Sequence, residues 1–358
     1  MTQDEVIIRS GIVHILDGEL GYPVFSEEPL ELSPDINDFF RGLIYKLLSG
    51  DDLKKCSFDQ VMAEAPGEED APFEEDQVTQ PDGPSVYDLV KSFREEDLVE
   101  HSKILTQKLY DIMNANVDIP SGDFAVVTFQ LHSTPYLALL KMNYKESFVH
   151  MTQPSESGAN VNHIIRYRAT LPSATTRLSE AVIINLSDYQ VQIVEKKYEV
   201  NGSKVNYLSE LYLHCHAAMS SKTKLDIVTK AVEQVNKKYY EEQPVKQMEA
   251  KRVIQEEIAS TGSIRVEDIG EKLFGEIPEV KEAFDQTMEK YHMEKAEVRP
   301  QSEKTTQKFD KQYIKTDTGI EIRIPMEQYE DVNQVEFITN PDGTISVLIK
   351  NINHLTTR

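Results

Sequence analysis

The sequence predicts an α+β protein with a mostly antiparallel sheet and helices, followed by a helical region and a C-terminal β-hairpin. Two observations lead to this fold class. Helical spacing of apolar residues precedes a run of apolar strands instead of alternating with them, and the chain returns to strand patterns at its end. We expect an N-terminal α+β domain over residues 1–202, a helical region over 203–298 and a β segment over 299–358.

The first elements are a strand and a helix. "EVIIRSGIVHILD" (5–17) is rich in Val and Ile and indicates a strand. Ser33 is a good N-cap, Pro34 suits the first helical position, and Gly50 ends a stretch in which apolar residues recur at helical spacing. A second helical stretch is expected from about residue 85 to residue 114.

A proline-bracketed acidic segment separates these helices, over about residues 59–84. Its centre, "EAPGEEDAPFEED" (64–76), contains seven acids and no base. Such a composition is typical of a solvated, mobile loop. The functional alternative is a nucleic-acid mimic or a docking segment for a basic partner.

The sheet is expected between residues 120 and 200. "DFAVVTFQL" and "PYLALLKMNYK" are joined by "HSTP" and predict a hairpin. "NHIIRYRATL", "EAVIINL" and "YQVQIVEKKYEV" add three strand candidates. The expected sheet is therefore mainly antiparallel.

Residues 207–294 are predicted to be mainly helical. "TKLDIVTKAVEQVNKKYYEE" is amphipathic, and two short helices flank a turn at Gly275–Pro278. Near the C-terminus, Asn340-Pro341-Asp342-Gly343 is a strong turn signal between two alternating strands.

Composition and charge limit the class of protein. With 39% hydrophobic and 28% charged residues, the chain can bury a core. The net charge is −23, of which −18 belongs to residues 1–100 and only −5 to the remaining 258. Because charges are screened over about 8 Å at physiological salt, an acidic front third does not prevent a basic contact elsewhere.

The compartment is indicated by the cysteines and the N-terminus. The only two cysteines, Cys56 and Cys215, are far apart in sequence, which predicts neither a disulfide framework nor a four-ligand zinc site. No apolar run is long enough for a membrane span, and the N-terminus lacks the features of a secretory signal. We expect a cytoplasmic protein with reduced thiols.

Two motifs raise the question of metal chemistry. In "LHCHAA" (213–218), the helical pattern would direct His214 and His216 apart. On a strand the two would share a face, but a third ligand would have to come from elsewhere, so we expect no metal site there. Glu195 and Lys197 could form part of a magnesium-dependent nuclease if they share a strand face beside an acid. The candidate acids are Asp188 and Asp123.

Other catalytic signatures are missing from the sequence. It contains no glycine-rich phosphate loop and no G-x-S-x-G elbow. We therefore expect no enzyme and no cofactor, with the nuclease kept as an alternative. The helices around Gly275 have helix-turn-helix spacing, but the second is acidic, which favours a structural helix pair.

Basic residues that could meet DNA lie in two places. The polar side of the predicted helix near 222–239 carries lysines, with Asp226 and Glu233 among them, and a predicted strand and the loop after it carry arginines. An ordinary solvated face is the alternative reading for the helix. The candidate DNA-binding residues are Lys222, Lys224, Lys230, Lys237, Lys238, Arg166, Arg168 and Arg177.

Three segments give the chain a family resemblance. They are "IIRSGIVHILD", "PYLALLKMNYK" and "TDTGIEIRIPMEQYEDVNQVEFITNPDGTISVLIKNI". In this order they resemble the 37-kDa nucleoid-associated bacterial protein family over nearly the whole chain. The resemblance implies a cytoplasmic protein at the bacterial nucleoid, in contact with double-stranded DNA or with DNA-bound proteins.

Taken together, these features predict a nucleoid-associated protein that binds DNA weakly and non-specifically, without catalysis and without a membrane anchor. Two alternatives remain: a protein-interaction module that reaches the nucleoid through a partner, and the magnesium-dependent nuclease. The sequence is compatible with a homo-oligomer.

Overall fold

The computed structural model describes residues 1–58, 83–116, 118–200, 202–240, 244–354 and 356. The acidic segment expected at about 59–84 therefore lies outside the described residues, apart from Gly83 and Pro84. The chain divides into two compact units, unit 1 (Met1–Met219) and unit 2 (Ser220–Arg358). The expected three-part division at 202/203 and 298/299 stays a prediction.

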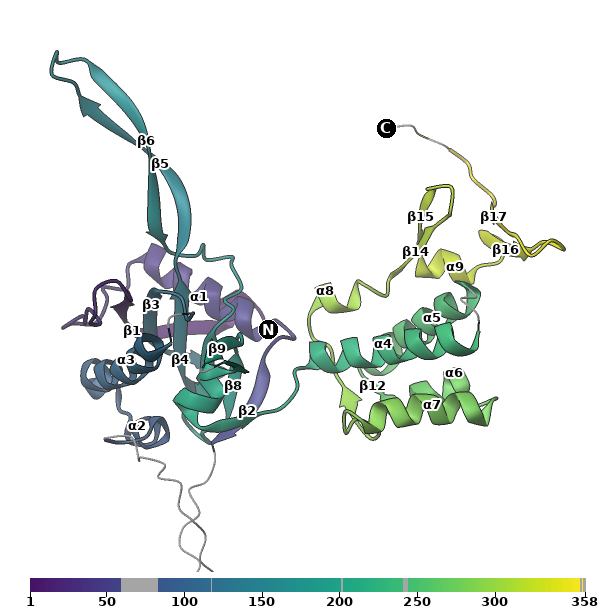
Figure 1. Ribbon diagram of the computed structural model, residues 1–358, viewed down its shortest axis with the longest axis horizontal. Helices are drawn as coiled ribbons and strands as arrows, with labels where there is room; N and C mark the ends of the chain where they lie inside the picture. Colours follow the sequence, from purple (N-terminus) through teal and green to yellow (C-terminus); the bar gives the residue numbers. More distant parts are fainter. Residues whose placement is uncertain (59–82, 117, 201, 241–243, 355, 357–358) are drawn as a thin grey trace, which may run out of the picture. The chain divides into compact units, whose positions relative to one another are not determined.

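Unit 1 is built on a seven-stranded sheet in which all neighbouring strands are antiparallel (Figure 1). In spatial order the strands are β1 (Val6–Leu16), β3 (Gly122–Leu131), β4 (Thr134–Asn143), β7 (Ala181–Asn185), β8 (Val191–Val194), β2 (Lys54–Phe58) and β11 (Cys215–Ala217). This sheet confirms the predicted α+β class and the hairpin between residues 123 and 145.

Helices cover both faces of this sheet. Alternation along β3 sends Phe124 and Val126 to one apolar cluster and Ala125 and Val127 to the other. The first cluster is closed by α2 (Val86–Ser92), α3 (Leu98–Ala115) and the helical turn η3 (Tyr207–Leu213). The second is closed by α1 (Pro34–Leu48), whose N-cap Ser33 accepts a hydrogen bond from the Ile36 amide, as predicted.

The helix predicted from residue 85 to 114 is interrupted. It consists of α2, the short turn η2 (Glu95–Asp97) and α3. At the break, Phe93 leaves the helical conformation, with a ψ of 134°, and its side chain is buried. The Arg94 guanidinium donates a hydrogen bond of 2.7 Å to the Phe93 carbonyl. The amphipathic pattern was read correctly, but tertiary packing of Phe93 ends the first helix early.

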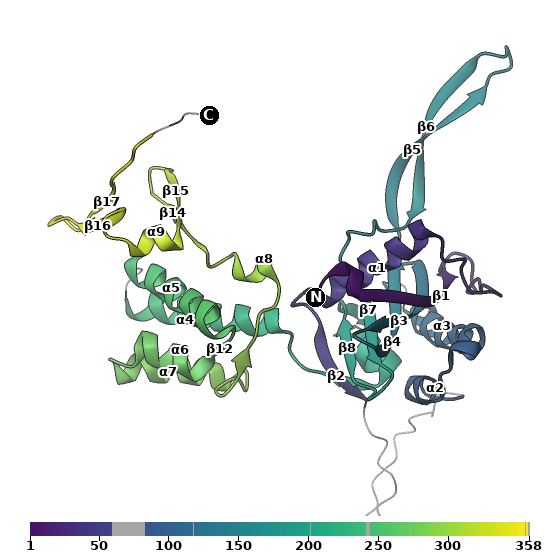
Figure 2. The same ribbon diagram turned by 180° about the vertical axis from the view of Figure 1, so that it is seen from behind.

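A second part of unit 1 is a two-stranded ribbon formed by β5 (Lys145–Pro154) and β6 (Asn160–Thr170). Figures 1 and 2 show this ribbon extending away from the seven-stranded sheet. Another small ribbon joins β9 (Tyr198–Val200) to β10 (Ser203–Val205).

Unit 2 begins with the helices α4 (Ser221–Tyr239), α5 (Pro244–Thr261), α6 (Val266–Phe274) and α7 (Pro278–Glu289). α4 packs against α5 and α7, and the rings of Phe274 and Phe284 join α6 to α7 at 5.6 Å. The predicted helix pair around Gly275 is confirmed.

The rest of unit 2 consists of short helices and ribbons. They are β12 (Ile264–Arg265) with β13 (Glu297–Val298), α8 (Glu303–Thr306), β14 (Lys311–Lys315) with β15 (Glu321–Pro325), α9 (Met326–Glu330), and β16 (Val335–Thr339) with β17 (Ile345–Ile349). The last turn is the predicted one, since the Gly343 amide donates to the Asn340 carbonyl at 2.9 Å and Gly343 has a φ of +84°.

Candidate nucleic-acid interface

The α4 helix has one buried side and one lysine-bearing side. Its N-cap Ser220 accepts a hydrogen bond of 3.2 Å from the Thr223 amide, and Leu225, Val228, Val232 and Val235 are buried. The opposite side exposes four of the five predicted lysines, while the fifth is half-buried. The exposed ones are Lys222, Lys230, Lys237 and Lys238, and the half-buried one is Lys224.

Acidic residues on α4 are partly compensated by another segment. Asp226 lies 3.7 Å from the ammonium of Lys308, which follows α8 and is itself more than half exposed. Glu233 is exposed on the same side of the helix. Lys308 thus adds a cation to this face that the sequence pattern could not indicate, because it lies far along the chain from α4. We call Lys222, Lys224, Lys230, Lys237, Lys238 and Lys308 the α4 lysine face.

Two local features shape the α4 lysine face. The ammonium of Lys238 lies 4.7 Å from the ring centroid of Tyr239. Lys230 lines a surface hollow of about 250 Å³ between α4 and α7, together with Gln234, Thr287 and Tyr291. The face is therefore a mixture of cations, polar groups and two tyrosine rings.

The three predicted arginines all belong to unit 1 and differ in their surroundings. Arg166 and Arg168 are exposed on β6, where Arg166 forms an ion pair with Glu146. Arg177 instead pairs with Asp52 at 2.8 Å and donates to the Lys46 carbonyl at 3.1 Å. Its charge thus holds the end of α1. No acidic side chain of the described residues forms an ion pair with Arg168.

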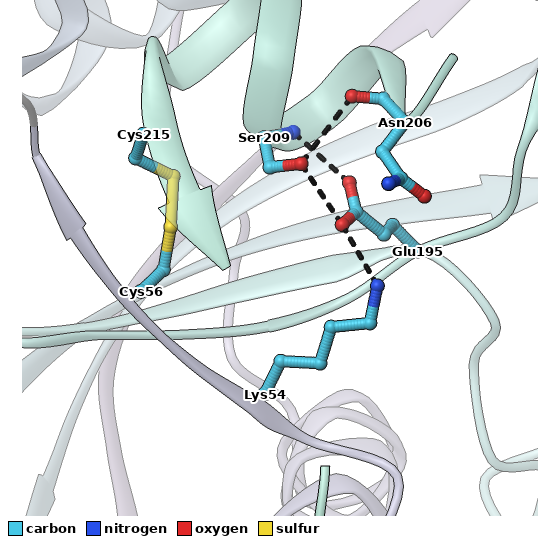
Figure 3. Close-up of a disulfide and its surroundings, with 6 residues drawn as sticks. All are labelled: Lys54, Cys56, Glu195, Asn206, Ser209 and Cys215. Carbon is cyan, nitrogen blue, oxygen red and sulfur yellow. Dashed lines mark hydrogen bonds and ion pairs between the residues drawn. A yellow bond between two sulfur atoms is a disulfide. The ribbon is translucent and has the colours of Figure 1, made fainter. Parts of the chain in front are cut away.

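The proposed nuclease residues have different roles in the structure (Figure 3). The Glu195 carboxylate is fully buried, 3.1 Å from the ammonium of Lys54, and it accepts hydrogen bonds from the Ser209 amide at 3.0 Å and hydroxyl at 2.9 Å. Asp123 instead accepts a hydrogen bond of 2.7 Å from Tyr144. Glu195 therefore fastens η3 to the sheet.

The two cysteines are joined, which corrects the expectation of reduced thiols. Cys56 on β2 and Cys215 on β11 form a disulfide with a Cα–Cα distance of 6.2 Å (Figure 3). The helix expected at 213–218 is also wrong: the helical turn ends at Leu213, His214 is left-handed, and residues 215–217 pair with β2. Strand pairing at the sheet edge brings together two residues that sequence distance had separated.

This correction also changes the surroundings of the two histidines. His214 and His216 now flank a disulfide-bonded cysteine, which has no thiolate to offer a metal. Within the parts of the chain that the structure covers, no group of three or more His, Cys, Asp or Glu side chains could hold a metal ion.

A buried polar network in unit 1 had no signal in the sequence. The hydroxyls of Tyr207 and Tyr198 donate to Glu180 at 2.7 and 3.1 Å, and Asn143 bridges Glu180 to the ammonium of Lys141. Burial lowers the pKa of Lys141 to about 8, although Glu180 and Asp123 act in the opposite direction. The network is enclosed in the core and stabilises the β4–β7 region.

Comparison with known families decides the kinship of this chain. The family model described as nucleoid-associated protein YejK matches residues 12–355. The chain belongs to this family. Its members are named for association with the nucleoid, and the match extends over both compact units. No curated protein matches the sequence.

Family membership confirms the resemblance found in the sequence and places the protein at the nucleoid. Among the described residues, no helix is long and apolar enough to cross a membrane. In the helix pair α6 and α7, Lys281 pairs with Asp285 at 2.8 Å and Lys272 forms an ion pair with Glu257.

Proposed function

We propose that this nucleoid-associated protein binds double-stranded DNA directly, weakly and without sequence preference, through the α4 lysine face. The observation that carries the proposal is the two-sided character of α4. One side is buried in unit 2, so the helix orientation is fixed, and the other exposes four lysines with Lys308 beside them. Such a row of cations meets phosphates without reading base edges.

The affinity follows from the charge balance. Each phosphate contact releases counterions and adds about 0.9 to the slope of log affinity against log salt. The face offers a small number of lysines, and Asp226 and Glu233 lie among them. With a net charge of −23 opposing approach, we propose binding that is weak at physiological salt and that strengthens steeply at low salt.

A second, smaller contact is proposed for the arginines of unit 1. Arg168 is exposed on β6, and Arg166 beside it could exchange Glu146 for a phosphate. Arg177 is left out, because its ion pair with Asp52 and its bond to the Lys46 carbonyl are part of the packing of α1.

Absence of catalysis is also part of the proposal. It is supported by the contacts of Glu195, whose two carboxylate oxygens are taken up by Lys54 and Ser209 in the core. A nuclease carboxylate would have to face a metal ion and a substrate phosphate. Incubation of DNA with the protein and Mg²⁺ tests this, and cleavage would contradict it.

The DNA proposal is tested by gel shift at graded salt with two variants of equal charge. In the first, Lys222, Lys230, Lys237 and Lys238 are replaced by Gln. In the matched control, four exposed lysines elsewhere in unit 2 are replaced by Gln: Lys290, Lys295, Lys304 and Lys315. We expect the first variant to lose most binding at about 50 mM salt and the control to lose little.

Equal losses in the two variants would show that total charge matters and the α4 lysine face does not. No binding of the purified wild type at about 50 mM salt would reject direct contact. The alternative would then be recruitment by a DNA-bound protein, seen as DNA association that returns when a nucleoid extract is added.

A further inference from the structure

The β5–β6 ribbon, here called the arm, joins the rest of unit 1 at its base. The hydroxyl of Tyr144, the residue before β5, donates to Asp123 of β3 at 2.7 Å. Within the arm, the Thr170 hydroxyl closes the base by donating to the Lys145 carbonyl at 2.6 Å. No position described in either strand is buried. Figures 1 and 2 both show the arm extending clear of the sheet.

The two faces of the arm differ in charge. Opposite residues of an antiparallel pair share a face, and residues two apart along a strand do so as well. Beyond the base of the arm, one face is formed by the pairs Ser147–Tyr167, Val149–Ile165, Met151–His163 and Gln153–Val161 and contains no Asp, Glu, Lys or Arg; Lys145 lies at the base, two residues before this stretch. We call it the uncharged face. The other face carries Phe148, Ile164, Arg166 and Arg168.

The uncharged face is too apolar for a ribbon that stands alone in water. Tyr167 is 52% exposed, Val149 39% and Val161 38%, and the remaining Met151 and Ile165 are half-buried. A single two-stranded ribbon is at best marginally stable in water, and it gains independent stability when its apolar face is packed against another layer. The arm therefore lacks a second layer among the described residues.

We propose that this second layer is the same face of a second copy of the chain, so that two arms pack face to face in a symmetric dimer. The absence of charge selects this occupant over DNA, because the uncharged face offers no cation to a phosphate. Two copies of a chain with a net charge of −23 repel each other electrostatically. Contact through the uncharged face avoids bringing acidic side chains of the two copies together.

Symmetry agrees with this occupant, and the area sets how strongly it binds. In a two-fold dimer the same patch serves both copies, so that one contact covers both uncharged faces. The seven-residue face is about 24 Å long and about 10 Å wide, and packing it against its copy removes on the order of 700 Å² of accessible surface in total. That area is smaller than a standard specific interface, which predicts a weak dimer that dissociates on dilution.

Sedimentation velocity of the full chain without DNA tests the proposal, from about 1 to about 100 μM, a range suited to a weak dimer. The disruptive variant is Val149→Glu with Ile165→Glu, a directly opposed pair on the uncharged face. The matched control is Phe148→Glu with Ile164→Glu, which adds the same two charges to the same ribbon on its opposite face.

We expect the wild type and the control to shift from monomer to dimer with rising concentration, and the disruptive variant to stay monomeric. Because the arm contributes no buried residue, all three proteins should melt at the same temperature at low concentration. A wild type that is monomeric throughout, a disruptive variant that still dimerises, or a control that dissociates equally would each overturn the proposal. DNA binding is measured separately, so its loss or survival decides the proposed function independently.

Discussion

Nε2 of His14 lies 2.8 Å from Oγ of Ser102, and both side chains are fully buried. The Ser26 amide donates to Nδ1 of the same imidazole at 3.1 Å, so Nδ1 is the acceptor and Nε2 carries the hydrogen. The Ser102 hydroxyl in turn donates a hydrogen bond of 2.8 Å to the Val99 carbonyl. This chain of bonds joins β1 to α3 and requires a neutral imidazole.

The His14 relationship predicts an acid-sensitive fold. Burial lowers the pKa of His14 to about 4, helped by the charge of Lys103. The unfolded chain binds this proton near pH 6.5, so the stability is complete above pH 6.5 and decreases as pH falls towards 4, by about 3 kcal/mol in all. We expect His14→Gln to have a lower free energy of unfolding than the wild type at pH 7. Between pH 6.5 and 4, urea unfolding should show that this free energy falls less in the variant than in the wild type. Parallel losses in both proteins would contradict this origin.

The buried ammonium of Lys141 predicts a second rise of stability with pH, in the alkaline range. Its folded pKa of about 8 lies below the ordinary value of 10.5, so the folded state releases the proton first and stability rises between these values. Above pH 10 the raised pKa values of Tyr198 and Tyr207 make stability fall again. We expect urea unfolding to show a gain of up to about 3 kcal/mol from pH 8 to 10 that Lys141→Met abolishes. A gain of equal size in the variant would exclude Lys141 as the cause.

The disulfide predicts a dependence of stability on redox conditions. Cys56 and Cys215 close a loop with a sequence separation of 159 residues, which restricts the unfolded chain strongly. We expect reductant, or the double variant Cys56→Ser with Cys215→Ser, to lower the free energy of unfolding by about 2–5 kcal/mol. Thermal melts measure the loss, and reductant should leave the double variant unchanged. Two free thiols in the denatured, unreduced protein would show that the bond is absent.

The contacts of Glu195 predict a structural phenotype for Glu195→Gln. Glu195 accepts from the Ser209 hydroxyl and the Lys54 ammonium on Oε1 and from the Ser209 backbone amide on Oε2. A Gln side chain has one acceptor oxygen and its NH₂ would face one of these donors, so the variant should be about 1–3 kcal/mol less stable. We expect its affinity for DNA to match that of the wild type under conditions in which both are folded. Urea unfolding and gel shift measure the two quantities. If the variant were as stable as the wild type but differed from it in DNA cleavage with Mg²⁺, a catalytic role of Glu195 would be supported instead.

The α4 lysine face predicts a change in salt dependence as well as in affinity. If all four exposed lysines meet phosphates, replacing them by Gln should reduce the slope of log affinity against log salt by up to about 3.6. Fluorescence anisotropy with a DNA duplex over a range of salt concentrations measures the slope. An unchanged slope together with lower affinity would show that these lysines act only through the long-range field.

Several elements were predictable because their signals are local. Ser33 and Pro34 mark the start of α1, and the period of two along β3 divides its side chains between two clusters. The turn at Asn340–Gly343 requires a positive φ only at its glycine. The lysines of α4 were also identified from helical spacing, because burial of one side determines which residues are exposed on the other.

The structure adds most where a distant segment overrides a local pattern. Residues 215–217 have a helical context, yet they pair with β2 at the edge of the sheet. Arg177 follows a basic strand, but its guanidinium turns back to Asp52. In both cases the partner lies more than a hundred residues earlier in the chain, which periodicity cannot register.

By itself, the sequence determined the α+β class, the positions of most helices and strands, the uneven charge and the family, because each is written in neighbouring residues or in their order. Only the tertiary structure decided that Cys56 bonds to Cys215, that Lys54 neutralises Glu195, and that Lys308 compensates Asp226. The physical reason is that sheet order and helix packing choose which distant side chains meet, and burial then determines their charge and their contacts.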